Sequence, residues 1–151
     1  MTTGLPPTII ATYSDVTTGK TILILETILA LTPADYDHLA RAVQVEAATG
    51  TNDEYCVAVS ILNRVNSPVF PNNVADVVYA PGQYEGFLYR RPAAKSSVVA
   101  RLKNTDNLLE AYSIIGDRTS FKGQSMLPYR VVAEDPMCDR KGNFYHYHWQ
   151  S

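Results

Sequence analysis

The sequence predicts a mainly helical α+β domain. Between residues 32 and 116, apolar side chains recur at helical spacing behind recognisable N-caps. Short aromatic runs with extended character follow at residues 119–122 and 143–149, which predicts a small β element. Residues 1–31 differ from the rest and predict a β-rich N-terminal extension. We therefore expect one folded domain over residues 32–151, with residues 1–31 packed on it or on a partner.

Composition agrees with a single globular domain. The 151 residues suffice for one core, and 46% of them are hydrophobic against 19% charged. A net charge of −2 without a basic run disfavours nucleic acid as a partner. The apolar run at residues 21–31 contains Glu26 and is too short to span a membrane. The first residues do not resemble a signal peptide, so we expect a soluble chain without its own export signal.

The N-terminal extension carries a hairpin signal. Two runs rich in β-branched residues flank the polar turn at residues 15–20. This pattern holds no chemistry of its own, and it suits docking to a partner.

The first helix of the domain has clear boundaries. Thr32 is a suitable N-cap, Pro33 fits the first helical position, and Asp35 adds negative charge to the first turn. Gly50 is expected to stop the helix. One apolar stripe results, formed by Tyr36, Leu39, Ala40, Val43 and Ala47.

The second helix begins after Asn52 or Asp53 and continues through residue 65. Its apolar residues cover most of its circumference, which is typical of a helix at the centre of a fold. The polar exceptions Ser60, Asn63 and Arg64 then require hydrogen-bond partners.

The remaining segments alternate between loops and helices. A proline-rich loop precedes a short helix over residues 74–80, and residues 81–87 form another loop. A helical region over residues 94–116 breaks near residues 104–106, where a new N-cap signal occurs. Cys56 is expected to be a buried thiol, although a disulfide with Cys138 is also possible.

Glu46 is the first candidate for chemistry. Most helical glutamates are simply exposed. This one lies on the flank of the apolar stripe, with no lysine or arginine within one helical turn. Partial burial without a cation would raise its pKa, as a general acid at neutral pH requires.

A second carboxylate is not evident. Asp53, Glu54 and Asp76 each open a helix, and their role as capping charges explains them. Glu85 lies in a loop and could face a cleft. Nothing in the spacing fixes a pair, so the two-carboxylate glycosidase arrangement is not demonstrated.

Two further features are ambiguous between ligand binding and packing. The loop at residues 80–87 offers the amide of Gln83 and the ring of Tyr84, but a packed turn is equally compatible. His146 and His148 would share one face of a strand. With few other candidate ligands in the chain, we expect no metal site and no cofactor.

An ordered set of motifs resembles the SleB-like cell-wall hydrolases, known from spore-cortex-lytic enzymes and from phage. The set consists of LARAVQVEAATG (residues 39–50), ILNRV (61–65), SPVFP (67–71) and VVYAPGQY (77–84). Later stretches, at residues 116–122 and 142–147, are similar to the closing strands of that family.

The resemblance implies a lysozyme-like α+β fold that cleaves the MurNAc–GlcNAc glycan of peptidoglycan. It places the catalytic acid at Glu46 and implies the mechanism of a lytic transglycosylase, in which the substrate supplies the nucleophile. Hydrolysis by water would instead require a base such as Glu85 or Asp53. The residues expected to support substrate binding are Asn63, Gln83, Tyr84, Phe121, Tyr145 and His146. Asn63 could equally be a buried structural amide, and Phe121 a core ring.

Two settings and one rival function remain open. Without a signal peptide, the protein would reach the cell wall as a holin-released lysin or as a virion component docked to phage structural proteins through residues 1–31. The alternative is a non-catalytic phage structural or tail protein that keeps the fold to bind glycan or a subunit. The residue pairs at 50–51 and 54–55, which differ from the family pattern, keep this alternative open.

Overall fold

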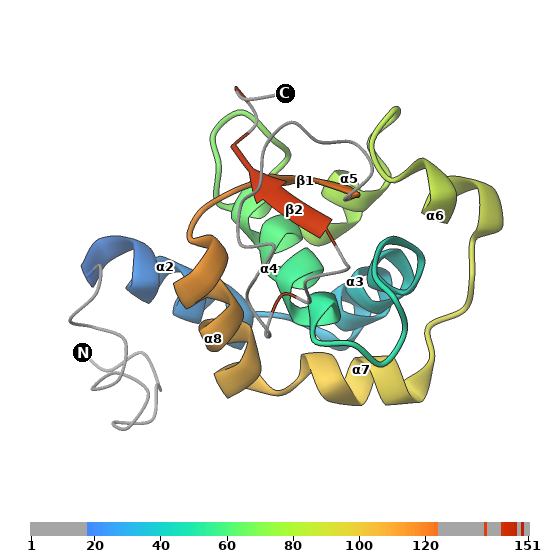
Figure 1. Cartoon of the computed structure of the whole chain (residues 1–151), viewed down its shortest axis with the longest axis horizontal. Coiled ribbons are helices and arrows are strands. Elements are labelled where there is room, and N and C mark those ends of the chain that lie inside the picture. Colours follow the sequence, from blue (N-terminus) through green and yellow to red (C-terminus); the bar gives the residue numbers. More distant parts are fainter. Residues whose placement is uncertain (1–17, 124–137, 139–142, 148, 150–151) are drawn as a thin grey trace.

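The computed structural model describes residues 18–123, 138, 143–147 and 149. Helices form the bulk of these residues, and a two-stranded sheet covers one end (Figure 1). The elements in chain order are α2 (Thr18–Leu29), α3 (Pro33–Glu46), α4 (Asp53–Val65), α5 (Val74–Val78), α6 (Glu85–Arg90), α7 (Ser96–Leu102), α8 (Thr105–Ile115), β1 (Ser120–Gly123) and β2 (Asn143–His146). This confirms a mainly helical α+β architecture.

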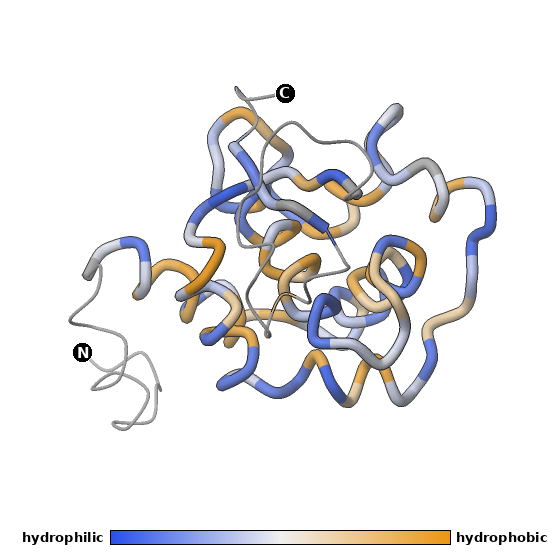
Figure 2. The backbone as a smooth tube through the Cα atoms, viewed as in Figure 1, coloured by the Kyte–Doolittle hydropathy of each residue, from blue (hydrophilic) through white to orange (hydrophobic). Residues whose placement is uncertain are grey.

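Helix α4 is the centre of the core, as its sequence predicts. Every residue from Asp53 to Arg64 is buried. The helix contacts α2, α3, α5, α7, α8 and β1, so most of the fold is assembled around it (Figure 1). In Figure 2, the surrounding helix α7 alternates between hydrophobic and hydrophilic colours along its length, because only one face of it meets the core.

Helix α3 begins as predicted. The Thr32 hydroxyl accepts from the Asp35 backbone N–H, and the Asp35 carboxylate accepts from the Thr32 backbone N–H, which completes a capping box. The helix ends at Glu46, before the expected stop. Ala47 is its extended C-cap, and Gly50 adopts a φ of 85° in the following turn.

The β-hairpin prediction is wrong for residues 18–29, which form helix α2; its first run lies outside the described residues. The buried residues of α2 are Thr21, Ile24, Leu25 and Ile28. Their spacing is that of one helical face, which packs on α4 and α8. The β-branched composition suggested strands, but burial of this face against the core outweighs that local preference.

The later helices largely follow the sequence. α7 and α8 are separated at the expected break, where the Asn104 side chain caps α8 by accepting from the Asn107 backbone N–H. Part of the expected loop at residues 81–87 is instead helical, because α6 begins at Glu85.

The predicted extended runs form an antiparallel pair. β1 and β2 are in register with Phe121 opposite Tyr145 and Ser120 opposite His146. Cys56 on α4 is bonded to Cys138, so the expected free thiol is wrong and the alternative of a disulfide holds. Among the described residues, every helix is too short or too polar to cross a membrane.

Candidate active site

Glu46 is the last residue of α3 and is partly buried. Within the described part of the chain, its carboxylate has no hydrogen bond and no ion pair. Burial raises the pKa of Glu46 above its ordinary value, and the nearby positive charge of Arg90 opposes this in part. The negative end of the helix dipole also favours the protonated form.

Side chains of α3 bind the segment at residues 92–95, which follows Arg90. Arg41 donates from Nε to the Pro92 carbonyl at 2.8 Å and stacks over the Phe87 ring. One turn further along, the Gln44 side chain donates to the Ala93 carbonyl and accepts from the Lys95 backbone N–H. The chain on both sides of residue 92 is thereby fixed against α3.

Gly86 allows helix α6 to approach α3 closely. A Cβ atom at this position would lie 2.6 Å from Val45 Cγ1, well inside contact distance. Any larger residue would force the Val45 side chain or one of the helices to shift. This contact packs α6 against α3 at the residue before Glu46.

The strand β2 holds the end of α3 from the other side. The Asn143 amide donates both to the Glu46 carbonyl, at 3.1 Å, and to the Asp53 carboxylate, at 2.8 Å. The Tyr145 hydroxyl donates to the other Asp53 oxygen at 2.5 Å. The last residue of α3, the first residue of α4 and β2 therefore form one rigid connection.

Three aromatic residues of the predicted site form a continuous series. The ring centroids of Tyr84 and Phe121 are 6.4 Å apart, and those of Phe121 and Tyr145 are 5.8 Å apart. Tyr84 is buried, and its hydroxyl has no hydrogen-bond partner among the described residues. Burial raises the pKa of Tyr84 to about 12; the charge of Arg64 opposes this in part, and the charge of Glu46 adds a smaller increase.

Arg64 organises the side of the site next to Gln83. It donates to the Thr119 carbonyl, at 2.6 Å, and to Gln83 Oε1, also at 2.6 Å. Its guanidinium lies over the rings of Phe70 and Tyr84. Gln83 is itself exposed, and its oxygen is held by Arg64, so its amide N–H groups face solvent.

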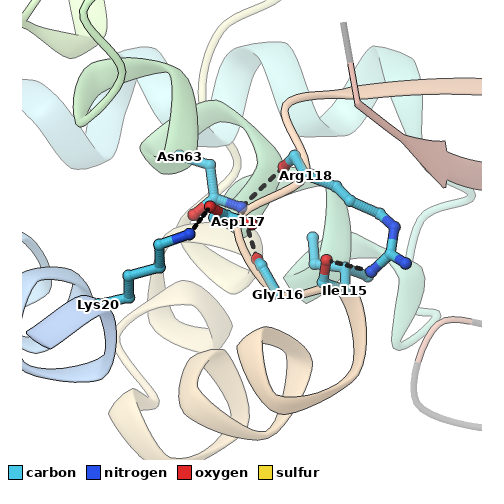
Figure 3. A network of polar contacts seen from close by, with 6 residues as sticks. All are labelled: Lys20, Asn63, Ile115, Gly116, Asp117 and Arg118. Carbon is cyan, nitrogen blue, oxygen red and sulfur yellow. Dashed lines mark hydrogen bonds and ion pairs between the residues drawn. The ribbon is translucent and has the colours of Figure 1, made fainter. Parts of the chain in front are cut away.

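Asn63 and His146 face different surroundings. The Asn63 amide donates to the Gly116 and Arg118 carbonyls at 2.8 and 2.7 Å (Figure 3). This agrees with the structural alternative for Asn63. His146 is buried and its Nδ1 lies 2.8 Å from the Tyr147 carbonyl. Burial lowers the pKa of His146 below its ordinary value.

The carboxylates at the start of α4 are more than capping charges. Asp53 is buried beneath β2, as described above. Glu54 is fully buried and forms a two-pronged ion pair with Arg101 of α7, at 2.7 and 3.1 Å. The sequence did not predict this ion pair, because Glu54 and Arg101 are 47 residues apart in the chain. Asp76 does lie in the first turn of α5, where its backbone N–H is capped by Asn73.

Arg64 and Asn143 are the residues that sequence analysis did not assign to the site. Arg64 was detectable as a polar residue on an otherwise apolar helix. Asn143 lies in the closing motif at residues 142–147, but its contacts with Glu46 and Asp53 could not be read from sequence, because these partners lie 97 and 90 residues earlier. Among the described residues, no cluster of histidine, cysteine, aspartate and glutamate could hold a metal ion. His148 lies outside them.

Comparison with known proteins assigns the chain to a protein family. A family model described as Cell Wall Hydrolase matches residues 48–147. The chain belongs to this family. Within the cell wall hydrolases, it is similar to the spore cortex-lytic enzyme of Bacillus subtilis (strain 168), with 36% identity over 80 residues. The alignment covers 48% of this chain and 26% of that relative, so the chain spans about a quarter of the relative's length. No solved structure matches the chain.

Proposed function

We propose that this cell wall hydrolase cleaves the MurNAc–GlcNAc bond of peptidoglycan with Glu46 as the general acid. The observation that carries the proposal is the Glu46 carboxylate, which is partly buried, lacks an ion pair among the described residues and has a raised pKa. A carboxyl group with a raised pKa keeps its proton to higher pH and can donate it to a glycosidic oxygen as the bond breaks. Membership of the family and similarity to a spore cortex-lytic enzyme support a substrate in the cell wall.

The reaction proposed is that of a lytic transglycosylase. Glu46 gives its proton to the glycosidic oxygen, and the bond between that oxygen and C1 of the muramic acid breaks. The resulting carboxylate then takes the proton of the C6 hydroxyl, whose oxygen bonds to C1 and closes a 1,6-anhydro ring. The surroundings of Asp53 support this route over hydrolysis, because its buried oxygens already accept from Asn143 and Tyr145. Glu85 remains the alternative base for water.

The neighbouring side chains would position the sugar. The exposed amide of Gln83 is a donor fixed by Arg64, and the Tyr84 hydroxyl is a buried group without a partner among the described residues, whose pKa the charge of Glu46 raises slightly. Phe121 and Tyr145 support the ring of Tyr84 from β1 and β2. A lysozyme-like fold remains part of this proposal, and the contact between Asn143 of β2 and the Glu46 carbonyl at the end of α3 is compatible with it.

The Cys56–Cys138 disulfide supports action outside the reducing cytosol. A holin-released lysin and a virion component are both compatible with it. Because α2 packs in the core, the proposed docking to phage structural proteins falls to residues 1–17. Unchanged virion assembly after deletion of residues 1–17 would remove the docking role.

The experiment compares dye release from labelled peptidoglycan by wild type, Glu46→Gln and the exposed control Glu110→Gln. We expect Glu46→Gln to lose roughly 100- to 10,000-fold in rate and the control to match wild type. Near-wild-type activity of Glu46→Gln would assign the acid elsewhere. A folded wild type that is inactive on several wall types would favour the rival, a non-catalytic structural protein.

A further inference from the structure

A pocket lies apart from Glu46, between α2, the end of α4 and the end of α8. Its volume is about 270 Å³, and Glu46 is not among the residues that line it. The lining also includes residues 66–68, Thr119 and the aromatic residues Tyr147 and Trp149. The volume is near the lower end of ligand sites, which begin at about 300 Å³, and suits a single ring.

One wall of the pocket is an aromatic platform. The rings of Tyr147 and Trp149 are stacked, with centroids 4.5 Å apart and an interplanar angle of 7°. Trp149 is 69% exposed, and Leu23 of α2 adds an exposed apolar surface at 47%. A flat, accessible ring of this kind packs well against the C–H face of a pyranose, whose polarised hydrogens meet the negative face of the ring.

Polar groups lie in the same pocket. Thr119 is only 3% exposed, and its hydroxyl has no hydrogen-bond partner among the described residues. Such a buried hydroxyl costs free energy unless a ligand or water completes its hydrogen bonds. The Asn66 side-chain oxygen lies 2.8 Å from the Thr27 hydroxyl, which also lies 2.9 Å from the Leu23 carbonyl, so Asn66 is anchored to α2 beside the pocket.

The charges at the rim cancel each other. Lys20 of α2 reaches Asp117, with Nζ 2.6 Å from the carboxylate (Figure 3). Burial by itself would raise the pKa of Asp117, but hydrogen bonds from Lys20 and Tyr147 outweigh it and leave that pKa below its ordinary value. The pair therefore stays charged and internally neutralised at neutral pH, which favours an uncharged ligand.

We propose that this pocket is a second glycan-binding site, which takes one neutral N-acetylhexosamine ring. The ring packs on Trp149 while its polar substituents reach the Thr119 hydroxyl and the Asn66 amide. The site rests on the proposed function, since it would hold a glycan strand at a distance from Glu46.

The test uses Trp149, the single tryptophan of the chain, as a reporter. The full chain carrying Glu46→Gln is titrated with N,N′,N″-triacetylchitotriose while tryptophan emission is followed. We expect a saturable change, with an apparent affinity about tenfold weaker after Thr119→Val. The matched control is Thr105→Val, at a residue that does not line the pocket, and it should bind like its parent.

Three results would overturn the second site. These are an unchanged emission, equal affinities for both threonine variants, and an equal response to maltotriose, which lacks acetamido groups. None of these measurements depends on bond cleavage. An inactive wild type would therefore refute the proposed function but not the second binding site. An unchanged emission would refute the second binding site but not the proposed function.

Discussion

At the scale of single residues, the site depends on the environment of Glu46. Burial raises the pKa of its carboxylate, and the charge of Arg90 opposes this by favouring ionisation. A general acid must hold its proton at working pH, so the raised pKa is a requirement of the mechanism. The sequence indicated this from the apolar flank and the missing cation, but Arg90 lies too far along the chain to be read as its neighbour.

Replacement of Arg90 tests this electrostatic balance. Without the guanidinium, the Glu46 pKa rises further, so the alkaline limb of the pH–rate profile moves to higher pH in Arg90→Gln. The control Arg91→Gln alters an adjacent exposed arginine and should leave the limb in place. Peptidoglycan digestion rates over a pH series measure both; a downward shift in Arg90→Gln would contradict the assignment.

The same carboxylate predicts a pH-dependent stability. Its pKa is raised in the folded state, so the native protein binds the proton more tightly than the unfolded chain does. The stabilisation from that protonated carboxyl group is complete below the unfolded pKa, near 4.3, and is lost as pH rises through the folded pKa.

Thermal unfolding of Glu46→Gln measures this loss. At pH 7 its Tm should equal or exceed that of wild type, and the advantage of the variant should vanish towards pH 4. A Tm well below wild type at pH 7 would show that the carboxylate stabilises the fold.

At the scale of elements, local signals predicted most helix boundaries. Thr32 and Asn104 cap their helices through their own side chains, which is a local interaction and therefore readable from sequence. Helix α2 was misread because its β-branched residues favour a strand, whereas its helical face is buried by α4 and α8. The start of α6 was missed because Glu85 follows a turn without a recognisable cap.

Gly86→Ala tests how α6 is placed against α3. The new methyl group would meet Val45 Cγ1, so we expect a loss of about 1–3 kcal/mol in the free energy of unfolding, together with reduced activity. The control Gly19→Ala has open space within helix α2 and should be neutral or stabilising. Adding Val45→Ala to Gly86→Ala should restore part of the loss, measured by urea unfolding. Equal effects of the two glycine substitutions would contradict the close contact.

At the scale of the whole molecule, the decisive contacts join distant parts of the chain. Asn143 and Tyr145 on β2 donate hydrogen bonds to Asp53, and Cys138 forms a disulfide with Cys56. The partners are too far apart in the sequence for hydrophobic periodicity to predict these contacts. The family motifs indicated Glu46 as the candidate acid and predicted the order of the helices. The buried hydrogen bonds that join β2 to the start of α4 could be identified only from the structure.

Loss of the Cys56–Cys138 disulfide should lower the stability of the fold. Opening a link between residues 82 positions apart enlarges the unfolded ensemble, with an expected cost of about 2–5 kcal/mol. Reduction should therefore lower the Tm of the wild type. A variant with both cysteines replaced by alanine should have the Tm of the reduced wild type, and reductant should not change it. A Tm that reduction leaves unchanged would exclude this contribution.

Glu46 alone is proposed to carry proton transfer in cleavage of the peptidoglycan glycan. This proposal is tested most directly by digesting purified peptidoglycan with wild type and Glu46→Gln and identifying the muropeptides by mass spectrometry. We predict products that lack one water relative to reducing muropeptides and that disappear with the variant. Reducing-end products, or anhydro products that persist in Glu46→Gln, would contradict the account.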